Sequence, residues 1–350
     1  AAKRVLMRSG AAEAYDRLLI ATGSEPIVIP VPGAGLNGVV TFRDLDDVDA
    51  MLAASQAGGD AVVIGGGLLG LEAAHGLTTR GMKVPVLHLM PSVMERQLDE
   101  AAGWLLKSEL ERRGQTILTG ADTEGIYGEG EVEGVRLKDG REIPAKLVVM
   151  AVGIRPATRL AREAALEVKR GIVVDDQMGT SDPSIFAVGE CVEHRGLCYG
   201  LVAPIWEMCR ALADRLTERP SGYTGSVTST KLKVTGVDVF SAGNFAGGEG
   251  AEDIVLRDDA AGVYKRIVLR QNRIEGAVLY GDTMDGAWYF QMMREQKDIK
   301  DIRARLLFGE AHLGDAGHGG ENRAAAMADA AQVCDCNGVC KGDIVKAITI

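Results

Sequence analysis

Two short apolar runs flank a longer stretch with few helix breakers between Asp60 and Met94. This pattern predicts a strand from Ala61 to Ile64, a helix from Leu68 to Arg80 and a second strand from Val84 to Leu89. Strand, helix and strand in this order and at this length predict a βαβ unit. We expect the rest of the chain to be organised around it.

The apolar pattern predicts further elements on both sides of this unit. The first two strands, separated by Gly10, are expected to form a hairpin, and from Ser226 onward alternating strands predict a β-rich domain. Helices are expected over Asp44–Ala54, Asp99–Arg113, Ala203–Leu216, Ala287–Glu295 and Asp343–Ile350, strands over Ala1–Ser9, Tyr15–Ala21, Thr116–Gly120, Leu147–Val152 and Ile185–Val188, and a hairpin over Thr123–Glu142 with its turn at Asp139-Gly140.

Three glycines lie between the first strand and the helix of the βαβ unit. Gly65, Gly67 and Gly70 have the G-x-G-x-x-G spacing of a dinucleotide-binding turn. The first permits the tight turn, the second lets backbone N–H groups approach a pyrophosphate, and the third allows close packing of helix on strand. The phosphates then lie at the positive end of the helix. We therefore expect a nucleotide site here.

The second strand of the unit ends in a histidine where an acidic residue normally binds the adenosine ribose. This residue is His88, and neither Asp nor Glu stands at that position. Two interpretations stay open: His88 contacts the ribose or a 2′-phosphate, or it caps the edge of the strand. The choice between NADH and NADPH is therefore open as well.

Glycines also end three other predicted strands, where backbone can approach a nucleotide closely. Ala21-Thr22-Gly23 and Ala151-Val152-Gly153 are two such ends. Gly189-Glu190 is the third, and it is similar to the second flavin-binding motif of two-dinucleotide flavoproteins. In that motif an acidic side chain, usually Asp, accepts hydrogen bonds from the ribityl chain, and Glu190 is a variant of the same chemistry.

Composition narrows the class of protein. At 350 residues with 46% apolar residues, the chain is long enough for two or three domains with sizeable cores. A net charge of −10 argues against a nucleic-acid partner. We find no apolar run long enough to span a membrane and no signal-peptide core in Ala1 to Arg8. The six cysteines then fit a reducing compartment, and we expect a cytoplasmic α/β protein.

Half of the cysteines gather near the end of the chain. Cys334, Cys336 and Cys340 lie in a glycine-containing turn whose amides could hydrogen-bond the sulfurs of an iron–sulfur cluster. Zinc is the competing metal, because it also accepts thiolates. The remaining cysteines, Cys191, Cys198 and Cys209, show no C-x-x-C spacing and are predicted to be structural. His312 and His318 are assigned to a glycine-rich linker.

Taken together, these motifs resemble the FAD- and NAD-binding front part of the large subunit of assimilatory NAD(P)H nitrite reductase. The stretches that carry the resemblance span nearly the whole chain: YDRLLIATGSEP, AVVIGGGLLGLEAAHGL, HLMPSVMERQLD, AVGIRP, IFAVGECVEHRG, YTGSVTSTKLKVTG, YGDTMDGAWYF and CDCNGVCKGDIVKAI. The electron-transfer subunits of assimilatory nitrate reductase are similar and stay open as an alternative.

The resemblance implies an α/β fold of two interleaved dinucleotide-binding domains, like those of flavoprotein disulfide reductases. A β-rich third domain and the start of a small 2Fe-2S domain, similar to the bacterioferritin-associated ferredoxins, would follow. The implied divisions are 1–41 for part of the FAD domain, 42–155 for the NAD(P)H domain, 156–222 for the second part of the FAD domain, 223–310 for the β-rich domain, 311–332 for a linker and 333–350 for the iron–sulfur domain.

The resemblance also implies site residues. NAD(P)H would be bound by Gly65, Gly66, Gly67, Leu68, Leu69, Gly70, Glu72, His88 and Gly153; FAD by Thr22, Gly23, Arg43, Gly189 and Glu190; and a 2Fe-2S cluster by Cys334, Cys336 and Cys340. Electrons would pass from NAD(P)H through FAD and the cluster toward the reduction of nitrite to ammonia. Hydride transfer needs no protein acid or base, so we name no catalytic residue.

The family has parts that this sequence lacks. The first FAD glycine motif is expected upstream, and further cluster cysteines, siroheme and a 4Fe-4S centre are expected downstream. We therefore expect an internal part of a longer protein that alone holds FAD weakly or not at all. The resemblance allows a small subunit and an oligomer. A disulfide or peroxide reductase and a non-catalytic nucleotide-binding module are the alternatives.

Overall fold

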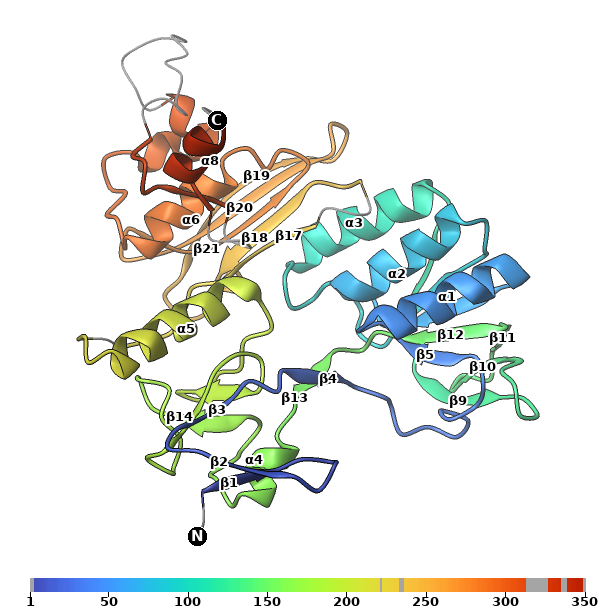
Figure 1. Ribbon diagram of the computed structural model, residues 1–350. Helices are drawn as coiled ribbons and strands as arrows, with labels where there is room; N and C mark the ends of the chain where they lie inside the picture. Colours follow the sequence, from blue (N-terminus) through green and yellow to red (C-terminus); the bar gives the residue numbers. More distant parts are fainter. Residues whose placement is uncertain (1–2, 221, 233–235, 313–326, 335–338, 349–350) are drawn as a thin grey trace. The chain divides into compact units, whose positions relative to one another are not determined.

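The computed structural model describes residues 3–220, 222–232, 236–312, 327–334 and 339–348 (Figure 1). Its contacts divide the chain into two units, each assembled from separate stretches of sequence. The first unit contains Ala1–Glu25, Ile154–Thr228 and His318–Ile350, and the second contains Pro26–Gly153 and Ser229–Gly317. The chain therefore leaves each unit and returns to it, which is the interleaving that the sequence predicts.

A five-stranded parallel sheet forms the centre of the second unit. The strands are, in order across the sheet, β5 (Val39–Thr41), β12 (Leu147–Met150), β6 (Ala61–Ile64), β7 (Pro85–His88) and β8 (Thr116–Thr119). Three helices lie on one face: α1 (Leu45–Ala57), α2 (Leu68–Thr79) and α3 (Glu100–Arg112) (Figure 1). The predicted βαβ unit is confirmed as β6, α2 and β7.

The entirely apolar sequence of β6 follows from burial on both faces of this sheet. Ala61 and Val63 pack into the core beneath the helices. Val62 and Ile64 point into a second core on the opposite face. Successive side chains of a strand alternate between faces, so a strand covered on both sides has no position for a polar residue.

A three-stranded antiparallel sheet covers the opposite face of the parallel sheet (Figure 1). Its strands, in order, are β11 (Glu142–Pro144), β10 (Gly134–Leu137) and β9 (Thr123–Tyr127). The predicted turn at Asp139-Gly140 joins β10 to β11, and Gly140 adopts a φ of 88° there. The single predicted hairpin is thus a meander, because a second reversal separates β9 from β10.

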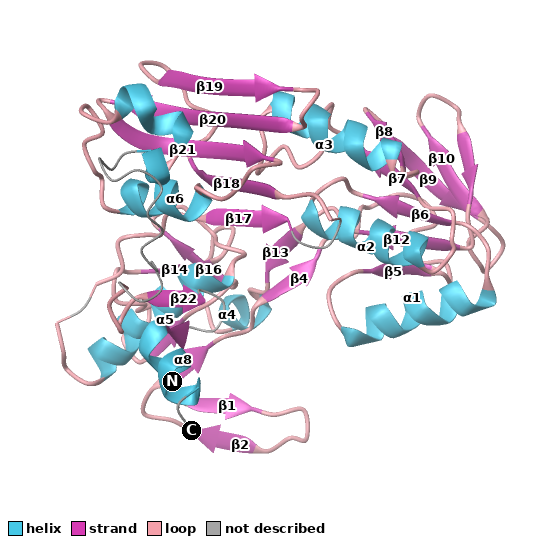
Figure 2. Ribbon diagram, turned by 90° about the horizontal axis from the view of Figure 1, so that it is seen from above, coloured by secondary structure: helices cyan, strands magenta, loops and turns pink. Residues whose placement is uncertain are grey.

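The predicted β-rich region is a five-stranded antiparallel sheet (Figure 2). Its order is β17 (Ser229–Leu232), β18 (Val239–Gly243), β21 (Arg273–Tyr280), β20 (Val263–Arg270) and β19 (Glu252–Asp258). Helix α6 (Gly286–Arg294) packs on one face, and two short 3-10 helices, Arg303–Phe308 and Glu310–His312, follow it. Apolar residues of the other face, such as Val239 and Val278, join the core that contains α3. This sheet and the parallel sheet are therefore parts of one unit.

Asp99, at the start of α3, joins this helix to the five-stranded antiparallel sheet. Its Oδ1 accepts a hydrogen bond of 3.0 Å from the Ala102 N–H and so caps the helix. Its Oδ2 accepts hydrogen bonds from the Tyr264 hydroxyl at 2.6 Å and from Arg266 at 3.2 Å. Burial raises the pKa of Tyr264, so this hydroxyl stays a donor. One carboxylate thus stabilises a helix end and a domain contact together.

The first unit contains pairs of short strands, two of which enclose one apolar core together with two helices. Its elements are β1 (Arg4–Leu6) with β2 (Ala12–Ala14), β3 (Leu18–Ile20) with β15 (Ile185–Ala187), β14 (Ile172–Val174) with β16 (Val192–His194), β4 (Ser24–Pro26) with β13 (Ile154–Pro156), β22 (Gln332–Cys334) with β23 (Val339–Cys340), and the helices α4 (Arg159–Glu163), α5 (Val202–Leu216) and α8 (Lys341–Ile348).

The predicted pairing of the first two strands is wrong. The hairpin partner of Arg4–Leu6 is Ala12–Ala14, a short segment that the apolar pattern does not mark. The apolar segment Leu18–Ile20 instead pairs in parallel with Ile185–Ala187. The reason is burial. Ile20 lies in the core of this unit, whereas the hairpin is exposed, so the apolar segment pairs with a buried strand and not with Arg4–Leu6.

None of the helices within the described residues combines the length and apolar character needed to cross a bilayer.

We predict that Asp99→Ala lowers the free energy of unfolding by about 2–4 kcal/mol, because it removes a helix cap, leaves the buried Tyr264 hydroxyl without its acceptor and takes one of two carboxylate partners from Arg266. Chemical denaturation followed by circular dichroism measures this loss. Tyr264→Phe, which removes one of the three bonds, should cost only about 1 kcal/mol. Equal losses of unfolding free energy in the two variants would contradict the conclusion that Asp99 stabilises the protein through three hydrogen bonds.

Candidate dinucleotide-binding sites

The turn between β6 and α2 has backbone approaches that only glycine permits. Gly65 adopts a φ of 123°, and a Cβ built on it would lie 2.3 Å from the carbonyl oxygen of Ala151. A Cβ on Gly70 would lie 1.9 Å from the carbonyl oxygen of Gly65. Both clashes are with backbone atoms, which cannot move aside. Two of the three motif glycines therefore hold strand and helix in contact.

The third glycine keeps the surface of the turn open. Gly67 is the N-cap of α2, and no protein atom lies within 4 Å of a Cβ built there. No side chain caps the helix, and no acidic residue lies in its first turn. The N–H groups of the first turn, which includes Leu68, Leu69 and Gly70, thus have no side-chain acceptor at this end. Such an end suits a phosphate, which brings negative charge and several acceptor oxygens.

Two other predicted residues flank this turn. Glu72 lies on α2 within its second turn, and partial burial raises the pKa of its carboxyl group. Gly153 follows β12 with a φ of 117°, and its carbonyl accepts a hydrogen bond from the Ile27 N–H at 3.0 Å. The N–H of Ala151 donates to the Ile64 carbonyl at 2.8 Å, so the predicted strand end lies against the glycine turn.

His88 is buried at the end of β7, with a relative exposure of 7%, and contacts the glycine turn directly. Its Nδ1 accepts a hydrogen bond of 3.0 Å from the Gly66 N–H. The ring proton therefore lies on Nε2, which is 2.9 Å from the Ser92 carbonyl oxygen and 3.0 Å from Oε2 of Glu95. Because both ring nitrogens form hydrogen bonds within the protein, the arrangement favours the interpretation that His88 caps the edge of the strand.

The first unit brings the other two predicted strand ends together. β3 and β15 are parallel neighbours, so the residues that follow them, Thr22-Gly23 and Gly189-Glu190, emerge at the same edge. Glu190 accepts a hydrogen bond from the Ser24 hydroxyl at 2.6 Å. Thr22 donates to the carbonyl of Ala157 at 2.7 Å. Sequence reasoning missed Ser24, although its place directly after the A-T-G strand end could have indicated it.

Two glycines at this edge adopt left-handed backbone without crowding. Gly23 has a φ of 67° and Gly189 a φ of 93°, and a Cβ on either meets no atom within 4 Å. Open space beside the turns and a fixed carboxylate fit a flavin nucleotide that brings hydroxyl donors. Arg43 belongs to the second unit, where it precedes α1, is exposed, and donates its N–H to Asp47 at 2.7 Å.

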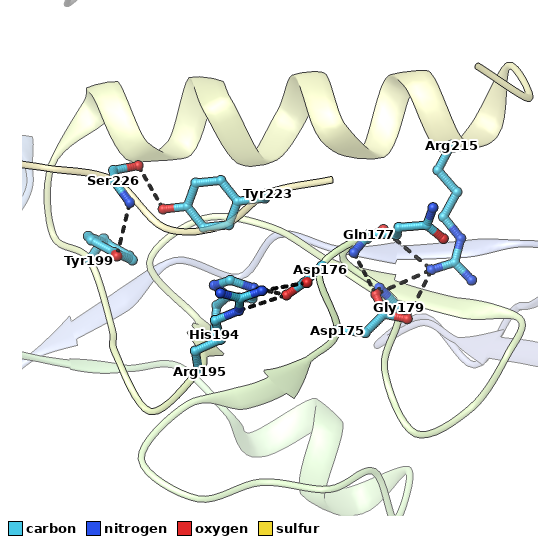
Figure 3. Close-up of polar contacts among 10 residues, drawn as sticks. All are labelled: Asp175, Asp176, Gln177, Gly179, His194, Arg195, Tyr199, Arg215, Tyr223 and Ser226. Carbon is cyan, nitrogen blue, oxygen red and sulfur yellow. Dashed lines mark hydrogen bonds and ion pairs between the residues drawn. The ribbon is translucent and has the colours of Figure 1, made fainter. Parts of the chain in front are cut away.

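The first unit also contains a polar network that the sequence does not reveal (Figure 3). Asp176 is 2.7 Å from the Arg195 guanidinium and 2.9 Å from Nε2 of the buried His194. These two partners, Arg195 first, lower the pKa of Asp176 to about 2. The His194 ring packs on Tyr223 with ring centroids 4.8 Å apart, and the Tyr223 hydroxyl lies 2.7 Å from the Ser226 hydroxyl. The network ties β16 to the segment after α5.

The cysteine predictions are described only in part. Cys336 lies outside the described residues, as do His318 and most of the predicted linker. Cys334 belongs to β22 and pairs in register with Val339, and the N–H of Cys340 donates to Asp343 at 3.1 Å. Within the described residues, no group of three or more histidines, cysteines or carboxylates could hold a metal ion. The cluster thus stays a prediction.

The other cysteines have the surroundings of structural residues. Cys191 is fully buried, with its sulfur 3.3 Å from the Val188 carbonyl oxygen. Burial raises the pKa of the thiols of Cys198 and Cys209. A raised pKa keeps a thiol protonated and unreactive, which argues against a redox nucleophile at either position.

A glycine turn of the dinucleotide type in one unit and a second set of glycine-ended strands in the other are features of the two-dinucleotide class of oxidoreductases. The chain belongs to the pyridine nucleotide-disulphide oxidoreductase family, whose sequence profile matches residues 1–208. Residues 229–297 match the C-terminal domain of rubredoxin NAD+ reductase. The predicted α/β class with a β-rich additional domain is confirmed.

The chain is similar to several curated proteins. It is 50% identical to a nitrite reductase [NAD(P)H] of Bacillus subtilis (strain 168), covering 99% of this chain and 43% of the relative. It is 42% identical to the assimilatory nitrate reductase electron transfer subunit of the same organism, covering 95% of this chain and 42% of that protein. These relatives confirm the resemblance found in the sequence. The chain spans less than half the length of either.

Solved structures agree with the fold. A ferredoxin reductase from Rhodopseudomonas palustris is 28% identical with a TM-score of 0.76, covering 82% of this chain and 72% of that one. NADH:rubredoxin oxidoreductase from Clostridium acetobutylicum is 27% identical with a TM-score of 0.70, covering 86% of this chain and 75% of that one.

We predict different outcomes for alanine at three glycines of α2 and its turn. Gly67→Ala should fold normally but bind NADH about tenfold or more weakly, because the methyl group occupies the open face of the turn. Gly76→Ala, in open space on the same helix, should retain binding and gain up to about 1 kcal/mol of stability. Gly70→Ala should destabilise the unit through its backbone clash. Calorimetric titration and thermal unfolding measure the two effects, and normal NADH affinity in Gly67→Ala would contradict the assignment.

We also predict a pH dependence from Asp176. Because its folded pKa is depressed from 3.8 to about 2, its ion pairs stabilise the protein above about pH 4 and lose this effect as the pH falls toward 2. Asp176→Asn should therefore be less stable than the wild type at neutral pH, and the difference should shrink on acidification. Unfolding midpoints measured over that range test this, with the exposed Asp16→Asn as control. A constant difference would contradict the role of the ion pairs.

Proposed function

We propose that this chain is the nicotinamide- and flavin-binding part of a longer nitrite reductase, which oxidises NADH or NADPH and passes the electrons toward nitrite. The observation that carries the proposal is the uncapped start of α2 behind an open Gly67. Similarity to nitrite reductases over nearly the whole chain supports the same activity. In this proposal NAD(P)H binds on the turn from Gly65 to Gly70.

The flavin would be held by the edge where β3 and β15 end. Glu190 is fixed by the Ser24 hydroxyl and would accept hydrogen bonds from ribityl hydroxyls, while the backbone around Gly23 and Gly189 leaves room for the nucleotide. FAD, when bound there, would supply the hydride-accepting chemistry and the ability to release electrons one at a time. The chain's contribution is to bind, align and exclude water.

The electrons would leave through an iron–sulfur centre. We propose that Cys334, Cys336 and Cys340 contribute thiolates to a 2Fe-2S cluster, with the remaining ligand from elsewhere in the longer protein. The sequence predicts a glycine-containing turn there, whose N–H groups would suit the sulfurs of a cluster. Zinc at the same thiolates is the competing outcome. Nitrite, and a small subunit if there is one, would be met by the parts of the protein outside this chain.

A second candidate is an electron-transfer subunit that serves nitrate reduction. The 42% identity to such a subunit in Bacillus subtilis supports it. A disulfide reductase is supported less well, because Cys191, Cys198 and Cys209 form no disulfide, and burial raises the pKa of the Cys198 and Cys209 thiols.

The longer natural protein, titrated anaerobically with NADH and then NADPH, tests the proposal. We expect at least one of them to bleach the flavin absorbance, and nitrite to restore it with formation of ammonia. Gly67→Ala in the same protein should slow the bleaching about tenfold or more, whereas Gly76→Ala should bleach at the wild-type rate.

Each other result has a clear meaning. Failure of both dinucleotides to reduce bound flavin would overturn the proposed function. Reoxidation by nitrate in the presence of its partner reductase, but not by nitrite, would favour the second candidate. Bound zinc without iron in the purified protein would replace the proposed cluster.

A further inference from the structure

His88 occupies the position that normally binds the adenosine ribose, and its side chain has no ring nitrogen left to bind a ligand. Both ring nitrogens of His88 are engaged, one with the Gly66 N–H and the other with the segment that follows β7. The ring also lies directly against the turn, since a Cβ on Gly66 would be 2.7 Å from its Cγ. His88 therefore cannot turn toward a ribose without breaking the contacts that hold the strand end to the turn.

The segment after β7 returns to the same turn and brings an acidic residue with it. The Met94 N–H donates a hydrogen bond of 3.0 Å to the Gly66 carbonyl. Met94 is buried and adopts a φ of 52°, which turns the chain sharply there. The next residue is Glu95, whose Oε2 lies 3.0 Å from Nε2 of His88. A carboxylate thus lies one imidazole ring away from the glycine turn.

Glu95 has the exposure that a ligand contact requires. Its side chain is 34% exposed, and within the described part of the chain His88 is its one hydrogen-bonding partner. With Oε2 held by the imidazole, Oε1 is left to accept a further hydrogen bond. A carboxylate that is anchored at one oxygen loses little conformational entropy when it binds at the other.

Two exposed apolar side chains lie in the same segment as Glu95. Leu89 and Met90 directly follow β7 and are 60% and 43% exposed. They lie at the carboxyl end of a strand in an open parallel sheet, which is where nucleotides bind in such sheets. Exposed apolar side chains at this edge are suited to the flat face of a purine.

We propose that Glu95, held in place by His88, supplies the acidic ribose contact that β7 lacks, and that the site therefore selects NADH over NADPH. Its free oxygen would accept the 2′-hydroxyl of the adenosine ribose, and its charge would repel a 2′-phosphate. Leu89 and Met90 would pack against the adenine. Glu95 is thus the specificity-determining residue, and His88 is a positioning residue that acts through it.

The neighbouring Arg96 carries a positive charge that would favour NADPH over NADH if its side chain contacted the ligand. It is exposed, and the described residues offer it no hydrogen bond or ion pair. A guanidinium can bind a 2′-phosphate. Glu95 is favoured because it is already fixed against the turn, whereas Arg96 would have to be ordered by the ligand at a cost in side-chain entropy. The two residues predict opposite preferences, so one set of variants separates them.

The inference rests on the proposed nicotinamide site, and direct binding tests it without any need for flavin or turnover. Calorimetric titration of the full chain with NADH and with NADPH gives the ratio of the two affinities. We expect the wild type to favour NADH by about tenfold or more. Glu95→Gln keeps the size of the side chain but removes its charge, and should reduce the ratio by about tenfold. Glu100→Gln, which removes an exposed negative charge on α3, should leave the ratio unchanged, as should Arg96→Gln.

A measurement on the unmodified chain accompanies the variants. Because a surface charge is screened by salt, the preference for NADH should narrow as ionic strength rises. Equal affinities in the wild type, or a ratio that does not change in a folded Glu95→Gln variant, would overturn the role of Glu95. If the ratio of the NADH and NADPH affinities changes in Arg96→Gln but not in Glu95→Gln, the end of β7 would be assigned to a 2′-phosphate instead. If neither dinucleotide binds the wild type, the nicotinamide site itself is wrong and this inference falls with it.

Discussion

The contact on which the second unit depends is the approach of two backbones between Gly65 and Gly70. The carbonyl oxygen of the first occupies the position that a side-chain carbon of the second would need. Helix α2 can therefore start directly against the end of β6, with its uncapped N–H groups beside the open face of Gly67. An open, uncapped helix start of the kind that suits a phosphate is thus a consequence of how tightly strand and helix pack.

The elements around this turn are held by polar groups that each serve two partners. His88 accepts from the turn and donates to the segment that returns to it. A few residues later Asp99 caps α3 and binds Tyr264 and Arg266 of the antiparallel sheet. In each case one buried or partly buried side chain forms hydrogen bonds to two elements, which is how a small number of polar residues can be buried at low cost. The nucleotide turn and the β-rich sheet are thereby joined within one unit.

Chain order alone gave good predictions where the physical signal is local. The βαβ unit follows from apolar runs and glycine spacing, because burial on both faces excludes polar residues and close packing excludes side chains. The Asp139-Gly140 turn is equally local. The hairpin partner Ala12–Ala14 was missed, since an exposed short strand carries no apolar pattern. Ser24 and the Asp176–His194 pair were missed because their partners are far away in the sequence.

The class of fold, the position of the glycine turn and the family follow from the order of the residues, because residue spacing and burial preference are local properties of a sequence. The contacts at the end of β7 depend on the folded molecule. There both nitrogens of His88 are engaged and Glu95 lies beside the ring, through a left-handed turn at Met94 that no local pattern marks. Hydrogen bonds between such positions depend on how the chain returns in space, and that is a property of the folded molecule.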